Sequence, residues 1–126
     1  MYRVGQSGKR PWGSWRVLAT GEGFAVKRID VAPGQRISLQ RHFARAERWT
    51  VVSGEGVVTL AARTRKVAAG DTVRVAPKIA HRLANTGTTT LTLIEVQLGA
   101  VLAESDIERL SDDYARPVSR ALKRRN

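Results

Sequence analysis

Residues 34–54, which read GQRISLQRHFARAERWTVVSG, decide the fold of this chain. Glycines bound the segment, and three side chains that can ligate a metal lie between them: Gln40, His42 and Glu47. Gln40 and His42 are two residues apart, so on a β-strand both side chains point to the same face. Glu47 follows after a short turn and opens an apolar run. The spacing therefore predicts a half-site for a metal, built on strands at 35–40 and 48–53.

A second segment, residues 70–85, supplies a fourth candidate ligand, His81, with Asn85 four residues later. Two half-sites of this kind, joined by a short hairpin region, resemble the sequence pattern of the cupin barrel. A lone Gln-x-His in a strand is common, whereas the whole spacing is far more specific. We therefore expect an all-β cupin fold, a double-stranded β-helix or jelly-roll barrel, with a metal held inside it.

Composition narrows the kinds of site that the chain can build. Its 126 residues fit one domain with one hydrophobic core. It contains no cysteine, which excludes disulfides and thiolate metal sites, so a metal must take nitrogen and oxygen ligands. The two histidines of the chain, His42 and His81, fall one in each half-site.

The charge of the chain points to anionic partners. The sequence has 22 lysines and arginines against 11 acidic residues, a net charge of +11. Such a balance favours phosphorylated metabolites, nucleic acid or acidic membranes. No apolar run is long enough to span a bilayer, and the N-terminus lacks the apolar core of a signal peptide. We therefore expect a cytoplasmic protein that does not enter the membrane.

Short strand-like runs with turn signals every eight to twelve residues are typical of an all-β sandwich or barrel. Ser105 and Glu108 form a capping box, which predicts a short C-terminal helix starting near Asp106. We expect a flexible N-terminal arm (1–9), a cupin domain (10–116) and a basic C-terminal tail (117–126). The further strands are expected at 15–20, 24–31, 57–61, 64–68, 72–76, 80–85 and 90–98.

The chain resembles a known family in six segments that cover nearly all of it. This family is the C-terminal cupin domain of type II mannose-6-phosphate isomerases, which is often fused behind a nucleotidyltransferase that makes GDP-mannose; a stand-alone cupin is expected here. The segments are RPWGSW (10–15), FAVKRIDVAPGQRISLQ (24–40), RAERWTVVSGEG (45–56), AHRLANTG (80–87), LIEVQLG (93–99) and SDIERLSDDYAR (105–116).

The resemblance implies a metal ligand set. In phosphomannose isomerases the metal, usually zinc, is held by a Gln, a His, a Glu and a second His. Residue by residue, these positions are Gln40, His42, Glu47 and His81, which agrees with the spacing argument. Two neutral imidazoles, one carboxylate and one amide oxygen suit zinc, or manganese, iron, cobalt and nickel.

The chain departs from the family pattern at several positions beside these ligands. The family typically reads Gln-x-His-His-His-Arg-Ala-Glu-His-Trp, whereas Phe43, Ala44 and Arg48 replace three of the histidines here. The family's Pro-x-Gly before the second metal histidine is Ala-Pro-Lys at 76–78. The ligands remain, but part of a polar neighbourhood is replaced.

The resemblance implies an aldose–ketose isomerase that converts mannose 6-phosphate to fructose 6-phosphate, or acts on a close relative. The reaction moves a proton between two carbons, which requires a base. Both histidines are assigned to the metal, so Lys27 and Glu95 are the candidate bases. Arg45 is a candidate for both catalysis and phosphate binding, and Arg36 and Lys78 are further candidates for binding the phosphate.

Two other functions stay open. The first is a non-catalytic cupin that keeps its metal and binds a sugar phosphate or nucleotide sugar, which the replaced histidines favour. The second is a nucleic-acid-associated cupin, motivated by the net charge but supported by no recognition helix or motif. Analogy with other cupins suggests a homodimer.

Overall fold

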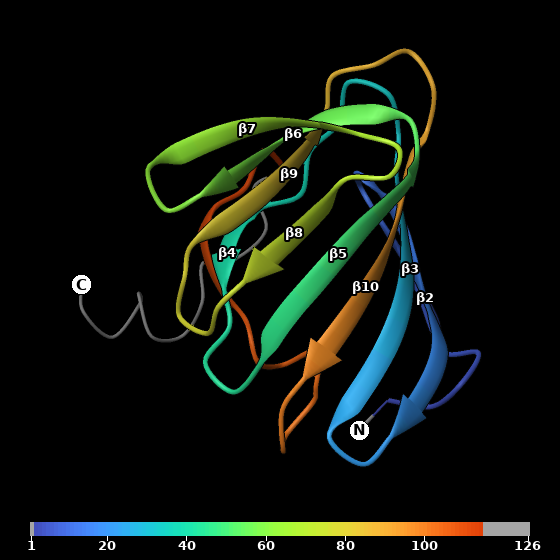
Figure 1. Ribbon diagram of the computed structural model, residues 1–126, viewed down its shortest axis with the longest axis vertical. Coiled ribbons are helices and arrows are strands. Elements are labelled where there is room, and N and C mark those ends of the chain that lie inside the picture. Colours follow the sequence, from blue (N-terminus) through green and yellow to red (C-terminus); the bar gives the residue numbers. More distant parts are fainter. Residues whose placement is uncertain (1, 115–126) are drawn as a thin grey trace.

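The structure is a computed structural model that describes residues 2–114, and it consists of two β-sheets that face each other (Figure 1). One sheet has six strands in the order β1-β2-β3-β10-β5-β8, and the other has five in the order β11-β4-β9-β6-β7. The strands are β1 (Ser7–Arg10), β2 (Gly13–Gly21), β3 (Phe24–Val31), β4 (Leu39–Arg41), β5 (Ala46–Ser53), β6 (Glu55–Leu60), β7 (Arg63–Ala68), β8 (Thr72–Val75), β9 (His81–Asn85), β10 (Leu91–Leu98) and β11 (Glu108–Ser111). The expected all-β fold is confirmed.

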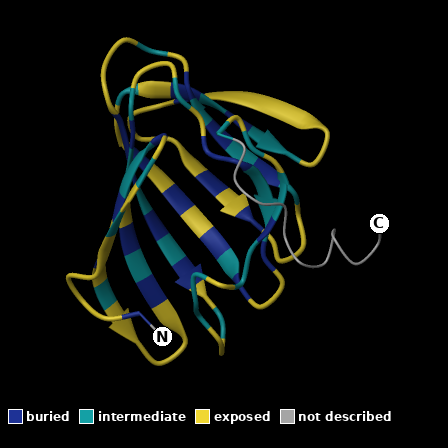
Figure 2. Cartoon of the chain, turned by 180° about the vertical axis from the view of Figure 1, so that it is seen from behind, coloured by how far each residue is buried: buried dark blue, intermediate teal, exposed yellow. Residues whose placement is uncertain are grey.

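Alternation along the strands builds the core between the sheets. On β5, Trp49 and Val51 are buried while Thr50 and Val52 are exposed, as the two-residue period of a strand requires. Figure 2 shows the same banding of buried and exposed residues along neighbouring strands. Each fully buried aliphatic side chain of this core stabilises the fold by about 1.5–3 kcal/mol.

Strand pairing brings the two half-sites together. In the five-stranded sheet β4 pairs with β9, and Gln40 lies directly opposite His81. In the six-stranded sheet β10 lies between β3 and β5, so Glu95 is opposite Lys27 on one side and Trp49 on the other. Residues from distant parts of the sequence therefore face one interior space.

The expected C-terminal helix is wrong. Residues 108–111 form strand β11, which pairs with β4, and residues 2–114 contain no helix. Asp106 accepts hydrogen bonds from the backbone N–H groups of Phe43 and Ala44 instead of capping a helix. Glu108 is buried in an ion pair with Arg41. Tertiary contacts have therefore used Glu108 of the capping box and Asp106, where the helix was expected to start. None of the described residues forms a helix long and apolar enough to cross a membrane.

The N-terminal residues, expected to be a flexible arm, are part of the fold. Strand β1 pairs with β2 over its full length, and Tyr2 is buried with its ring edge against Trp15. The arm was expected because residues 1–9 are polar and contain glycine, yet edge pairing needs only backbone groups. The basic tail at 117–126 lies outside the described residues.

The turn between β8 and β9 contains a strained lysine next to the metal half-site. Lys78 has a φ of 70°, in the left-handed region that glycine adopts readily. Its N–H donates to the carbonyl of His42 at 2.6 Å, which ties the two half-sites together. The glycine of the family's Pro-x-Gly thus corresponds to a real backbone requirement that this chain meets with lysine.

We predict that Lys78→Gly stabilises the protein. Glycine adopts this φ without a Cβ clash worth about 1–2 kcal/mol, and the greater freedom of glycine in the unfolded chain offsets part of the gain. The free energy of unfolding should rise by about 0.5–1 kcal/mol, measured by urea denaturation. Lys78→Ala is the control, because it removes the same charge but keeps the Cβ. Equal stabilisation by alanine would attribute the effect to charge.

Candidate metal centre

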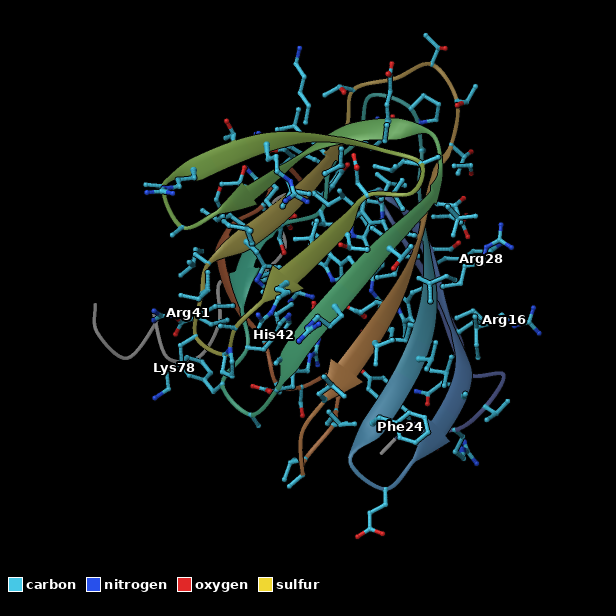
Figure 3. The ribbon with its side chains drawn as sticks, viewed as in Figure 1. Arg16, Phe24, Arg28, Arg41, His42 and Lys78 are labelled. Atoms are coloured by element: carbon cyan, nitrogen blue, oxygen red, sulfur yellow. The ribbon has the colours of Figure 1, made fainter. Side chains whose placement is uncertain are left out.

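Three buried side chains converge between the two sheets: His42, Glu47 and His81. The Nε2 atom of His42 is 3.3 Å from one Glu47 carboxylate oxygen, and that of His81 is 3.8 Å from the other. The two imidazole centroids are 4.9 Å apart. Figure 3 shows His42 between the sheets. The ligand atoms of the three residues lie within 4.8 Å of one another, close enough to share one ion.

Hydrogen bonds orient both imidazoles for metal binding. Nδ1 of His42 is 2.6 Å from the carbonyl oxygen of Asp106, and Nδ1 of His81 is 2.9 Å from that of Ile79. A carbonyl can only accept, so each Nδ1 carries the proton and each Nε2 presents its lone pair toward Glu47. This arrangement, in which the outer nitrogen is held by an acceptor, is typical of metal-binding histidines.

The electrostatic setting keeps the imidazoles neutral. Burial, followed by the positive charge of Arg45, lowers the pKa of His42 from 6.5 to about 4. Burial also lowers the pKa of His81. Metals bind the neutral form of histidine, so both side chains are in the state that ligation needs at neutral pH.

Gln40 completes the donor set by position. It lines the same cavity as the three clustered residues and lies opposite His81 in the sheet. Its Nε2 makes a long contact of 3.4 Å with the carbonyl of Ser38. Two imidazole nitrogens, a carboxylate and an amide oxygen match the ligands expected for zinc and similar divalent ions, so these residues fit a metal.

Arg45 is a buried cation in direct contact with this cluster. Its Nε donates to Glu47 at 2.8 Å, its Nη1 donates to the carbonyl of Ala103 at 3.1 Å, and its Nη2 is 3.3 Å from Nε2 of His42. The side chain is buried, so it is not a surface arginine. Its donors are directed at protein groups, and it therefore positions Glu47 and the loop at 99–107.

Glu95, one of the two candidate bases, lies within the same cavity. It is buried, and it accepts hydrogen bonds from Nε1 of Trp49 at 3.3 Å and Nε2 of Gln97 at 3.1 Å. Burial, followed by the negative charge of Glu47, raises the pKa of Glu95 to about 7. A carboxyl group with this pKa can both accept and release a proton near neutral pH.

Lys27, the other candidate base, is also in the cavity but is tied to an acid. Its Nζ is 3.0 Å from Glu104 and lies over the rings of Trp15 and Tyr2, at 4.3 and 5.0 Å from their centroids. A carboxylate and two ring faces are partners for an ammonium, which has no lone pair to take a proton. This environment suits anion binding better than proton abstraction.

The two other candidates for phosphate binding lie outside the cavity. Arg36 is half-exposed and pairs with Asp113 at 2.6 Å. Lys78 is exposed and points away from the barrel (Figure 3). Neither lines the space around the metal cluster, so their expected role in phosphate binding stays a prediction that this geometry does not support. A positive charge in a sequence does not reveal the direction of its side chain.

The cavity is also lined by residues that no sequence pattern assigned to a site. The cavity holds about 70 Å³ of space accessible to water. Three of these lining residues, Arg10, Trp12 and Trp15, belong to the segment RPWGSW. The family resemblance of that segment was the one sequence signal that pointed to them. Glu104 follows the last long strand, where no pattern marked it, and Arg109 lies in the segment SDIERLSDDYAR, which belonged to the family resemblance but suggested no site role. The unassigned lining residues include Arg10, Trp12, Trp15, Glu104 and Arg109.

Comparison with known proteins decides the family. Residues 2–112 match the model of the family described as mannose-6-phosphate isomerase C-terminal. This chain belongs to that family. It is 47% identical over 113 residues to the alginate biosynthesis protein AlgA of Pseudomonas aeruginosa, covering 90% of this chain and 24% of AlgA.

Two further comparisons place the chain in its wider context. It is 42% identical over 107 residues to mannose-1-phosphate guanylyltransferase of Salmonella montevideo, covering 85% of this chain and 23% of that protein. The chain thus spans about a quarter of the length of these relatives. A Klebsiella pneumoniae protein with a double-stranded β-helix domain has a TM-score of 0.66 at 22% identity, covering 75% of this chain and 80% of that chain, which confirms the cupin-type fold.

We predict that His81→Ala lowers metal affinity. Removing one of four ligands should reduce divalent metal content, measured by elemental analysis after dialysis against zinc. Because an ion that binds only the folded state stabilises it by mass action, the parent should melt at a higher temperature in zinc than in chelator. The variant should show little of this difference. A parent that neither binds metal nor responds to chelator would rule out the metal centre.

We also predict that His42 makes the metal-free protein less stable in acid. Its pKa is about 4 in the fold against 6.5 when unperturbed, so between these values the unfolded chain binds more protons and stability falls as pH falls. The contribution lost should be about 3 kcal/mol. Urea unfolding in chelator from pH 4.5 to 7 should show a shallower pH dependence in His42→Gln than in the parent. Parallel curves would contradict the assignment.

Proposed function

We propose that this chain is a metal-dependent aldose–ketose isomerase acting on a sugar phosphate, with mannose 6-phosphate as the first substrate to test. One observation carries the proposal: the buried cluster of His42, Glu47 and His81 shares a cavity with Glu95, whose pKa is raised to about 7. A ligand set beside a buried acid–base group is what proton transfer next to a carbonyl requires. Family membership supports the same chemistry.

Each residue has a separate task in this mechanism. When bound, the metal would supply Lewis acidity to substrate oxygens, and zinc suits the donor set best. Gln40, His42, Glu47 and His81 would hold it. Glu95 takes the proton from one carbon and returns it to the next.

Two further features of the cavity wall support proton transfer by Glu95. Trp49 and Gln97 fix the Glu95 carboxylate by donating hydrogen bonds to its two oxygens. Apolar residues such as Leu93 and Ile37 line the cavity and limit the access of water.

The loss of three family histidines is weaker support for a non-catalytic cupin than it appears from the sequence alone, because the residues that replace them face outward. Phe43 is 44% exposed, with Arg41 over its ring, and Ala44 is also exposed. Arg48 is exposed because it alternates with the inward-facing Glu47 and Trp49. None of these three positions lines the cavity. The substitutions therefore leave its inner surface unchanged.

A non-catalytic metal cupin that binds a sugar phosphate or nucleotide sugar is the second candidate function. The activities that the relatives' names record belong to proteins about four times as long, so those names do not choose between the two candidate functions. The expected homodimer stays a prediction.

We predict that Glu95→Gln abolishes most of the isomerase activity. A positioned base contributes about 10²–10⁴-fold to proton transfer, so turnover of mannose 6-phosphate in a coupled assay should fall at least a hundredfold. Metal content should stay at the parent level. Glu22→Gln, the same change at an exposed acid in the β2–β3 turn, should retain full activity.

Two outcomes would contradict this assignment. Unchanged turnover in Glu95→Gln would remove Glu95 as the base. A metal-loaded parent that binds mannose 6-phosphate but never converts it would overturn the isomerase in favour of the binding module. Elemental analysis of the purified parent, run alongside, tests whether zinc or another divalent ion is preferred.

A further inference from the structure

The carboxylate of Glu104 is surrounded by donors on one wall of the cavity. Tyr2 donates its hydroxyl to Oε2, and Nζ of Lys27 lies 3.0 Å from the same oxygen. Nη2 of Arg10 is 3.8 Å from Oε1. One hydroxyl and two cations thus converge on a single negative charge; Glu104 and the two cations line the cavity, whereas Tyr2 contacts Glu104 from outside its lining.

The donors and the acceptor differ in how firmly the fold holds them. Lys27 is buried on β3 and packs over the rings of Tyr2 and Trp15, and Arg10 lies on β1 with its guanidinium 5.6 Å from the Trp15 centroid. Glu104 belongs to the irregular loop at 99–107, and its side chain is 38% exposed. The Lys27 cation is held inside a sheet, whereas the side chains of Arg10 and Glu104 both reach solvent. Because Glu104 alone of these three belongs to a loop, its carboxylate is the exchangeable partner.

The group of charged residues around Glu104 lies where it can contact one end of a substrate bound at the metal. Arg10, Lys27 and Glu104 line the same cavity as the ligand cluster. Lys27 is on β3 and Glu47 on β5, with β10 between them. Lys27 is in register with Trp49 through Glu95, so Glu47 is also two residues further along its strand. Two strand spacings and two residues make about 12 Å between the backbones. The side chains on both strands extend into this gap, so a six-carbon sugar phosphate can bridge the rest with its sugar oxygens at one end and its phosphate at the other.

We propose that Tyr2, Arg10 and Lys27 form the phosphate subsite, and that the carboxylate of Glu104 occupies it until a phosphate displaces it. The subsite rests on the proposed function for its substrate class. A phosphate brings up to two negative charges and more acceptor oxygens than a carboxylate, so it gains stronger charge-assisted hydrogen bonds from the same donors. A neutral sugar cannot compete with Glu104, which makes the loop a selectivity device for phosphorylated substrates.

The test is inorganic phosphate binding to the full chain, measured by calorimetry at fixed ionic strength. Glu104→Gln removes the competing charge and should bind phosphate at least tenfold more tightly than the parent. Asp113→Asn is the matched control: it makes the same acid-to-amide change beside an arginine, Arg36, but outside the cavity. It should bind phosphate like the parent, because Asp113 lies outside the cavity. Both variants raise the net charge by one, so a difference in phosphate affinity between them reports the local effect of Glu104.

A second variant keeps the test decisive if Glu104→Gln does not fold. Lys27→Met retains the packing volume against the rings but removes the cation, and it should weaken phosphate binding at least tenfold while the protein still melts cooperatively. Equal phosphate affinity in Lys27→Met and the parent, or equal tightening by Glu104→Gln and Asp113→Asn, would overturn the subsite.

The outcome is separable from that of the isomerase proposal. Tighter phosphate binding by Glu104→Gln in a protein without turnover would keep the subsite and reject the reaction. Turnover of mannose 6-phosphate in the parent, with no effect of Glu104→Gln or Lys27→Met on phosphate binding, would keep the reaction and reject the subsite.

Discussion

The buried carboxylate of Glu47 is the constraint on which the rest of the site depends. A charge removed from water costs several kcal/mol unless charged or hydrogen-bonded partners compensate it. Arg45 at 2.8 Å and Nε1 of Trp49 at 3.0 Å supply that compensation, one to each carboxylate oxygen. The remaining lone pairs face the imidazoles of His42 and His81. A metal would add a second positive partner for Glu47. Its charge would help to compensate the burial of several polar side chains between the two sheets.

Strand register separates this polar site from the apolar core. On β10, Leu91 and Leu93 are followed on the same side by Glu95 and Gln97. The antiparallel partners match this order: Leu91 is opposite Val31, Leu93 opposite Ile29 and Val51, Glu95 opposite Lys27, and Gln97 opposite Glu47. One end of the barrel is therefore packed with aliphatic side chains while the other holds the ionisable groups. The packed end keeps the strands fixed, so the polar end can stay hollow.

The parts of the site that follow strand periodicity could be predicted from the sequence, and the parts made by loops could not. Gln40, His42, Glu47 and His81 were predicted because a two-residue period and a fixed spacing determine the face that each occupies. Glu104 was missed because its direction depends on the path of the loop at 99–107, for which no pattern exists. The helix at Asp106 was predicted wrongly for a related reason, since its capping signal is local whereas the ion pair of Glu108 with Arg41 spans 67 residues.

The same loop contacts both halves of the site, so they are not mechanically independent. Within residues 103–106, the carbonyl of Ala103 accepts from Arg45, Glu104 pairs with Lys27, and the carbonyl of Asp106 holds the imidazole of His42. The backbone that places an acid beside the cationic wall also sets the tautomer of a metal-binding histidine and supports the arginine that compensates Glu47. A movement of Glu104 large enough to admit a phosphate must therefore either be absorbed by its own side-chain torsions or be transmitted to His42 and Arg45. The carboxylate contacts the wall through a flexible side chain, whereas Ala103 and Asp106 act through backbone carbonyls, which makes exchange at Glu104 compatible with an undisturbed metal centre.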